Sequence, residues 1–195
     1  MEYSQREFVL KNGKICLIRR PKAEDAERIV RYQREFSGET PYLIVGPEDI
    51  TQTIEEQAER IERWNASPCQ LRLMAEVEGE LAGVAIVYGS GFQRRLRHRC
   101  TVDITLYQKF CGIGIGTVLL EELLKAAAVA GYEQAELEVV SANTPAIALY
   151  QKLGFKETGV VPCALKYADG SFADFLLMVK PLNSGTAGEI QRNNP

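Results

Sequence analysis

Short stretches of alternating apolar and polar residues recur along the chain and predict β-strands. Asn12-Gly13 and Asp169-Gly170 interrupt two of the apolar regions and are typical of the tight turns of hairpins. Strands joined by such short turns favour antiparallel pairing. The predicted strands lie in a hairpin over residues 8–19 and in residues 71–77, 81–88, 98–106, 136–140, 155–161 and 172–179.

Other stretches carry apolar residues at helical spacing and predict helices over residues 23–36, 54–65, 118–130 and 144–153. Pro21 and Pro145 stand near the starts of the first and last of these, as prolines commonly do. Thr53 and Glu56 form a capping-box pattern before the second helix. Helices that interrupt a mostly antiparallel series of strands indicate an α+β (α/β) fold. The buried stripe of the second helix is expected to contain Ile54, Ala58, Ile61 and Trp64.

Composition narrows the class of protein. The chain has 195 residues, a formal net charge of -3 and a pI of about 5.4, which suits one domain and argues against nucleic acid as a partner. Five cysteines without C-x-x-C spacing indicate free thiols, and the single histidine, His98, disfavours a metal site or a Ser-His-Asp triad. Because no apolar leader or spanning stretch occurs, we expect a cytoplasmic protein with no membrane partner. The polar residues 183–195 are expected to be a flexible tail.

Gly112, Gly114 and Gly116 stand between the strand predicted at 98–106 and the helix predicted at 118–130. Glycine lets the backbone approach a ligand closely, and free N–H groups at a helix start bind phosphate. A P-loop would need a lysine after its last glycine, but Thr117 stands there. A dinucleotide fingerprint would need its third glycine one position later. Coenzyme A, which also carries a pyrophosphate, is the third interpretation.

The run from Cys111 to Gly116 resembles the pyrophosphate loop of the GCN5-related N-acetyltransferase (GNAT) superfamily, which has the form Arg/Gln-x-x-Gly-x-Gly/Ala. Cys111 replaces the arginine or glutamine of that pattern. Residues 137–155, with Asn143 and Tyr150, resemble the family's LxV…N…AxxLYxxxGF segment. The resemblance covers most of the chain. It implies a mixed, mostly antiparallel central sheet of six to seven strands flanked by about four helices, in one N-acetyltransferase domain over residues 1–182.

The resemblance also implies transfer of the acetyl group of acetyl-CoA to a primary amine of a small molecule or a protein. An alkylammonium has a pKa of about 10.4 and no lone pair, so a base must first remove a proton. Tyr150 matches the family's tyrosine beside the coenzyme sulfur and is expected to be the general acid for the leaving thiolate. Glu138 is the first candidate base, because it matches the catalytic glutamate of ribosomal-protein N-terminal alanine acetyltransferases. Asp103 is the second candidate and Glu76 the third.

The same resemblance implies how acetyl-CoA binds. Backbone groups of Ile104 and Leu106 are expected to pair with the pantetheine arm, and Asn143 to contact the thioester or a pantetheine amide. No metal is expected, and a homodimer stays open because homodimers are common in the family. The expected cofactor-binding residues are Ile104, Leu106, Cys111, Gly112, Ile113, Gly114, Ile115, Gly116, Thr117, Asn143, Tyr150 and Lys152.

Plainer explanations stay open for several of these residues. The glycines could serve close packing, Tyr150 could be a core residue and Asn143 a helix cap. Direct attack in a ternary complex is expected, because no histidine lies near Cys111 in sequence to activate its thiol. The alternative is a regulatory protein that binds acyl-CoA with little or no catalysis. The acidic residues of 23–64 could favour a cationic amine or form a solvated surface.

Overall fold

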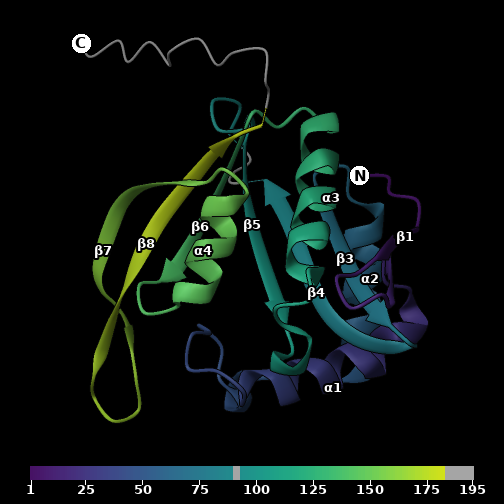
Figure 1. Ribbon diagram of the computed structural model, residues 1–195, viewed down its shortest axis with the longest axis horizontal. Helices are drawn as coiled ribbons and strands as arrows, with labels where there is room; N and C mark the ends of the chain where they lie inside the picture. Colours follow the sequence, from purple (N-terminus) through teal and green to yellow (C-terminus); the bar gives the residue numbers. More distant parts are fainter. Residues whose placement is uncertain (90–92, 183–195) are drawn as a thin grey trace.

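Among the residues that the computed structural model describes, 1–89 and 93–182, eight strands form one sheet (Figure 1). Their order is β1-β2-β3-β4-β5-β6-β8-β7. The sheet exceeds the expected six to seven strands because the short β1 pairs with β2 at its edge. The tail expected at 183–195 lies outside the described residues. The strands are β1 (Arg6–Val9), β2 (Ile15–Arg19), β3 (Gln70–Val77), β4 (Glu80–Gly89), β5 (Arg99–Leu106), β6 (Gln134–Val140), β7 (Lys156–Lys166) and β8 (Phe172–Pro181).

Neighbouring strands pair antiparallel except β5 and β6, which run parallel. The β5–β6 register joins residues 99–101 to residues 134–136. β5 continues to Leu106 and β6 to Val140, and β6 pairs along its whole length with β8. The two parallel strands therefore diverge beyond Thr101, which opens the sheet between them.

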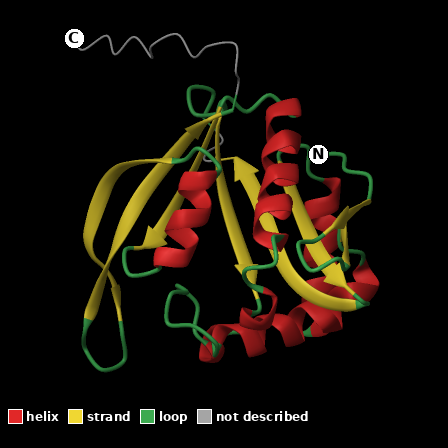
Figure 2. Cartoon of the chain, viewed as in Figure 1, coloured by secondary structure: helices red, strands yellow, loops and turns green. Residues whose placement is uncertain are grey.

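Helices cover both faces of the sheet. In the described chain these are α1 (Ala26–Ser37), α2 (Ile54–Ala66), α3 (Ile115–Val129) and α4 (Thr144–Lys152), with short 3-10 turns η1 (Ala23–Asp25), η2 (Pro47–Asp49) and η3 (Gln108–Phe110). α3 and α4 lie in front of the sheet in Figure 2 and pack into one hydrophobic cluster with it. α1 and α2 contribute to a second cluster, with Met74 and Leu81 of the sheet. The sheet thus has an α3–α4 face and an α1–α2 face.

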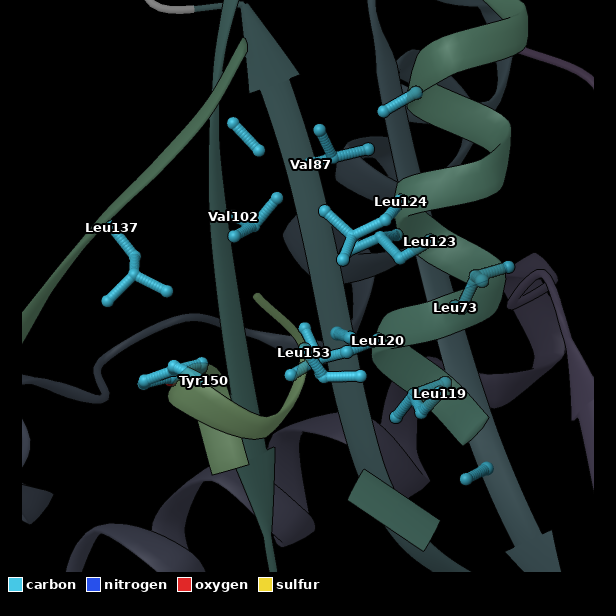
Figure 3. Close-up of a cluster of buried hydrophobic side chains, with 14 of the residues drawn as sticks. Leu73, Val87, Val102, Leu119, Leu120, Leu123, Leu124, Leu137, Tyr150 and Leu153 are labelled. Carbon is cyan, nitrogen blue, oxygen red and sulfur yellow. The ribbon is translucent and has the colours of Figure 1, made fainter. Parts of the chain in front are cut away.

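The larger cluster fixes α3 and α4 against the strands (Figure 3). Leu119, Leu120 and Leu123 of α3 are fully buried, because their spacing puts them on one side of the helix. Tyr150 and Leu153 of α4 belong to the same cluster. The helix that follows the glycine run is therefore held rigidly where β5 ends.

The capping box of α2 is confirmed, whereas its predicted apolar stripe is only partly right. Thr53 accepts a hydrogen bond from the Glu56 N–H at 3.2 Å, and the Glu56 carboxylate accepts one from the Thr53 N–H at 3.0 Å. Ile61 is fully buried, but Ile54 is 46% exposed and Gln57 is fully buried. Ile54 is exposed because it is the first residue of the helix and lies at its open end.

Candidate active site

The opening between β5 and β6 exposes backbone groups of two predicted residues. The Tyr107 N–H donates to the Ala82 carbonyl of β4 at 3.1 Å. Backbone groups alternate between the two edges of a strand, so those of Ile104 and Leu106 point away from β4, toward the opening. An extended ligand with amides of its own can pair with such an edge. This arrangement fits the pantetheine arm of coenzyme A.

The start of α3 is built to hold an anion. Gly112 and Gly114 have φ angles of +81° and +104°, which glycine adopts without strain. Gly114 is the N-cap of α3 and makes no side-chain capping bond. The Val118 N–H makes the first bond of the helix, to the Gly114 carbonyl at 3.2 Å. The N–H groups of residues 115–117 therefore have no acceptor within the helix, and the helix dipole favours a negative group there.

Gly116 and Ile115 have structural tasks beside their predicted role. A Cβ on Gly116 would lie 3.0 Å from Leu149 and 3.1 Å from Leu106, so this glycine lets α3 approach α4 and β5. Ile115 is fully buried, which leaves its backbone N–H as the group that a ligand could meet. The two residues thus position the helix end that is predicted to bind an anion.

Two lysines lie close to this helix end. The Lys152 Nζ donates to the Thr117 hydroxyl at 3.3 Å, which joins the end of α4 to the first turn of α3. The Lys11 N–H donates to the Ile113 carbonyl at 3.2 Å, and a Cβ on Gly114 would lie 3.8 Å from Lys11. Sequence reasoning missed Lys11, because it precedes the glycine run by about a hundred residues and only the fold brings the two together.

Tyr150 is 6% exposed and its ring packs edge-on against Phe155, with centroids 5.9 Å apart. Burial raises the pKa of the phenol, and the negative charge of Asp103 raises it further. The phenol is therefore protonated at neutral pH and can donate a proton. In Figure 3 its side chain lies beside β5, in the cluster that also contains Leu137 of β6.

Asp103 lies on the α1–α2 face of β5, opposite the face that carries α4. Its side chain is exposed, yet the pKa of the carboxyl is raised because the surrounding protein displaces water from it. Its charge contributes to raising the pKa values of Tyr32, Tyr88 and Tyr150, although burial is the larger cause for each. The charge of Asp103 therefore acts on tyrosines from α1, β4 and α4.

The other two candidate bases have different surroundings. Glu138 is exposed and, by strand alternation from Glu136, lies on the same face as Asp103. Both Glu138 and Asp103 contribute to the raised pKa of Tyr88, so the structure brings them to one region. The Glu76 carboxylate instead binds Arg19 at 2.6 Å and Arg28 at 3.0 Å, in an ion-pair network away from the opening.

The side chains of Asn143 and Cys111 each form one hydrogen bond within their own segment. The Asn143 side chain caps α4 by accepting a hydrogen bond from the Ala146 N–H at 3.3 Å, which leaves its amide nitrogen for another partner. The Cys111 sulfur lies 3.6 Å from the Tyr107 carbonyl. Burial, followed by the charge of Glu39, raises the pKa of the Cys111 thiol, so the thiol is not an activated nucleophile.

Comparison with known proteins agrees with this geometry. The sequence profile of the Acetyltransferase (GNAT) family matches residues 32–155. An N-alpha-acetyltransferase of Sulfurisphaera tokodaii is 33% identical over 181 residues, which cover 88% of this chain and 96% of that protein. A phosphinothricin N-acetyltransferase of Streptomyces viridochromogenes is 31% identical over 52% of this chain and 55% of its own length.

Solved structures show the same fold. A GNAT-family acetyltransferase of Streptococcus pneumoniae superposes with a TM-score of 0.81 and 29% identity, over 86% of this chain and 99% of that one. A phosphinothricin acetyltransferase of Sinorhizobium meliloti, solved in complex with AcCoA, superposes with a TM-score of 0.77 and 24% identity, over 91% and 94% of the two chains. In the described part of this chain, no helix has the length and apolar character needed to cross a bilayer. The chain belongs to the acetyltransferase (GNAT) family and is an acetyl-CoA-dependent acyltransferase.

Proposed function

We propose that this protein, as one domain over residues 1–182, transfers an acetyl group from acetyl-CoA directly to a primary amine in a ternary complex. In this proposal Tyr150 is the general acid and Asp103 the general base. The observation that carries it is the opening between β5 and β6, whose pairing ends at Thr101, two residues before Asp103. That opening lets a thioester on the α3–α4 face meet an amine on the α1–α2 face.

Asp103 is preferred to Glu138 for two reasons. A carboxylate whose pKa is raised by displaced water is a stronger base than an ordinary one. The charge of Asp103 also raises the pKa of Tyr150, whereas the charge of Glu138 raises the pKa of Tyr88. Glu138 stays the alternative, with water as a relay to the amine.

The proposed proton transfers balance. Asp103 accepts a proton from the acceptor ammonium, and the freed nitrogen lone pair forms the new C–N bond to the thioester carbonyl carbon. The C–S bond then breaks as the Tyr150 hydroxyl donates its proton to the departing thiolate. The attacking nitrogen loses the second proton that the amide does not retain, and this proton restores the Tyr150 hydroxyl. Asp103 releases to water the proton that it took from the ammonium. The backbone N–H groups on the free edge of β5 stabilise negative charge that develops on the carbonyl oxygen.

The experiment that tests this function is thiol release from acetyl-CoA in the presence of primary amines. The panel holds free amino acids, short peptides with free N-termini, polyamines and aminoglycosides. We expect release of coenzyme A that depends on one class of amine, with an N-acetylated product in the mass spectrum. Binding of acetyl-CoA in a thermal-shift assay without acetylation of any amine would favour the regulatory alternative.

A further inference from the structure

Arg72 is a buried guanidinium without a hydrogen-bonding partner at two of its nitrogens. It lies in β3 and is 4% exposed. Its Nε and Nη1 atoms meet no acceptor among the described residues. The guanidinium carbon lies 5.0 Å from the centre of the Trp64 ring of α2. A buried charge normally has an ionic partner, because leaving it unpaired is costly.

A second arginine without an ion pair lies nearby. Burial lowers the pKa of Arg72 to about 10, and the positive charge of Arg60 lowers it further. Burial also lowers the pKa of Arg60. In the described chain neither of the two has a carboxylate within salt-bridge distance, whereas other arginines do. Two neighbouring positive charges therefore lie at α2, and no carboxylate of the described residues forms an ion pair with either.

The side of α2 that faces the sheet adds a third unpartnered group. Gln57 is fully buried, and both polar atoms of its amide lack a hydrogen-bond partner among the described residues. Gln57 stands three residues before Arg60 and seven before Trp64, so the three lie on one side of the helix. Each buried polar group left unsatisfied in this way requires an explanation in the structure.

The register places Arg72 and the proposed base on one face of the sheet. Arg72 pairs with Ile86 of β4, and Ile86 pairs with Asp103 of β5. Residues directly opposite each other on neighbouring strands point to the same face. Two strand spacings separate Arg72 from Asp103, which is about 10 Å between their backbones. Because Arg72 has a long side chain, one small dipolar molecule could meet both charges.

We propose that Arg72 binds a carboxylate of the amine acceptor, so that the acceptor is an amino acid or another amine with a carboxylate a few bonds away. This inference rests on the acetyltransferase function proposed above and names the substrate class for that site. Arg72 holds the negative end of the acceptor and Asp103 receives the positive end. The acceptor supplies the missing partner of the guanidinium.

Several of the acidic residues of 23–64 that could favour a cationic amine are engaged elsewhere. Glu35 accepts a hydrogen bond from the Tyr107 hydroxyl at 2.5 Å, and Glu39 accepts one from the Gln108 N–H at 2.9 Å. Asp25 is paired with Arg19 at 2.7 Å. Glu56 closes the capping box of α2. These carboxylates serve the fold, which leaves the unpaired arginines as the stronger guide to the acceptor.

The test compares acceptors that differ only in the carboxylate. Thiol release from acetyl-CoA is measured with free L-amino acids and with their amides, and with peptides that have Glu or Gln in second position. We expect the wild type to prefer the acid over the amide by about tenfold or more in KM. If each free amino acid is preferred to its amide, the carboxylate that Arg72 binds belongs to a free amino acid. Preference confined to the Glu peptides assigns it to a peptide side chain.

Variants then tie this preference to Arg72. Arg72→Met and Arg72→Lys are measured beside Arg63→Met, a matched control at an exposed position of α2, with circular dichroism to show folding. Arg72→Met should lose the preference through a raised KM for the acid, and Arg72→Lys, which keeps the charge, should retain part of it. Arg63→Met should keep it. The proposal for Arg72 would be overturned if the wild type used amides or polyamines at least as well as the acids. It would also be overturned if the preference survived in every folded Arg72 variant. Neither result would contradict the proposed acetyltransferase function. Acetyl-CoA binding without acetylation of any amine would overturn the proposed function as well.

Discussion

Asp103 projects from the α1–α2 face of the sheet and Tyr150 packs from α4 against the opposite face, yet the charge of Asp103 helps to raise the pKa of the Tyr150 phenol. Asp103 lies in the part of β5 that no longer pairs with β6. The relationship leads directly to separate predictions for the two residues, because one must hold a proton and the other must lose one.

Tyr150→Phe should lower kcat by about 100-fold or more, since general acid catalysis typically contributes that much. The ring that packs against Phe155 is retained, so the KM for acetyl-CoA and the melting temperature should change little. Steady-state kinetics with a saturating acceptor measures both constants. A kcat within twofold of the wild type would remove the acid role from Tyr150.

Asp103→Asn should remove the acidic limb of the pH profile of kcat/KM. The folded-state pKa of Asp103 is raised by displaced water, so protonation of this carboxyl should reduce the rate from a higher pH than for an ordinary aspartate. Activity should therefore rise with pH as Asp103 loses its proton, and the asparagine variant should lack that rise. Glu138→Gln is the matched control on the same face and should keep the limb. Loss of the limb in Glu138→Gln alone would assign the base to Glu138.

Gly114→Ala should weaken acetyl-CoA binding more than it slows turnover. The φ of +104° at this N-cap costs a residue with a Cβ about 1–2 kcal/mol, which would distort the anion-binding end of α3. Gly170→Ala is a suitable control, because its φ of +86° imposes a similar strain in the turn between β7 and β8. Both variants should be destabilised in urea unfolding. Only Gly114→Ala should show a raised Kd for acetyl-CoA in calorimetry.

Asn143→Ala and Thr53→Ala compare two helix caps, of which only one adjoins the opening. Each loses a side-chain bond to a helix N–H, so each should lose about 1 kcal/mol of stability. Asn143→Ala should also raise the KM for acetyl-CoA, because its amide nitrogen is free to contact the thioester or a pantetheine amide. Identical kinetics for the two variants would leave Asn143 as a cap and nothing more.

The sequence predicted the strands and helices well where local signals are strong. The capping box at Thr53 and Glu56 and the turn at Asp169-Gly170 appear as expected, because each depends on neighbours in the chain. The stripe of α2 was partly wrong, since Ile54 meets no partner at the open helix end and Gln57 is buried by the tertiary fold. Local pattern does not specify what a helix later packs against.

The candidate site divides in the same way. The glycine run and the segment around Tyr150 could be read from spacing, since each motif is contiguous. Lys11 beside Gly114 could not, because the tertiary fold brings a turn residue to the glycine run. Arg72 on the face of Asp103 could not either, because strand register places it there. Glu76 was the third candidate base, but its engagement with Arg19 and Arg28 depends on β2 and α1.

The short parallel pairing between β5 and β6 has a consequence for how the fold holds together. It divides the hydrogen-bonded sheet into an N-terminal panel, β1 to β5, and a C-terminal panel, β6 to β8, joined by residues 99–101 and 134–136. An extended substrate lying in the opening would add hydrogen bonds along β5 and join the panels more firmly. We therefore expect the empty protein to unfold less cooperatively than its complex, and the amides of Ile104 and Leu106 to exchange with solvent much more slowly once coenzyme A is bound.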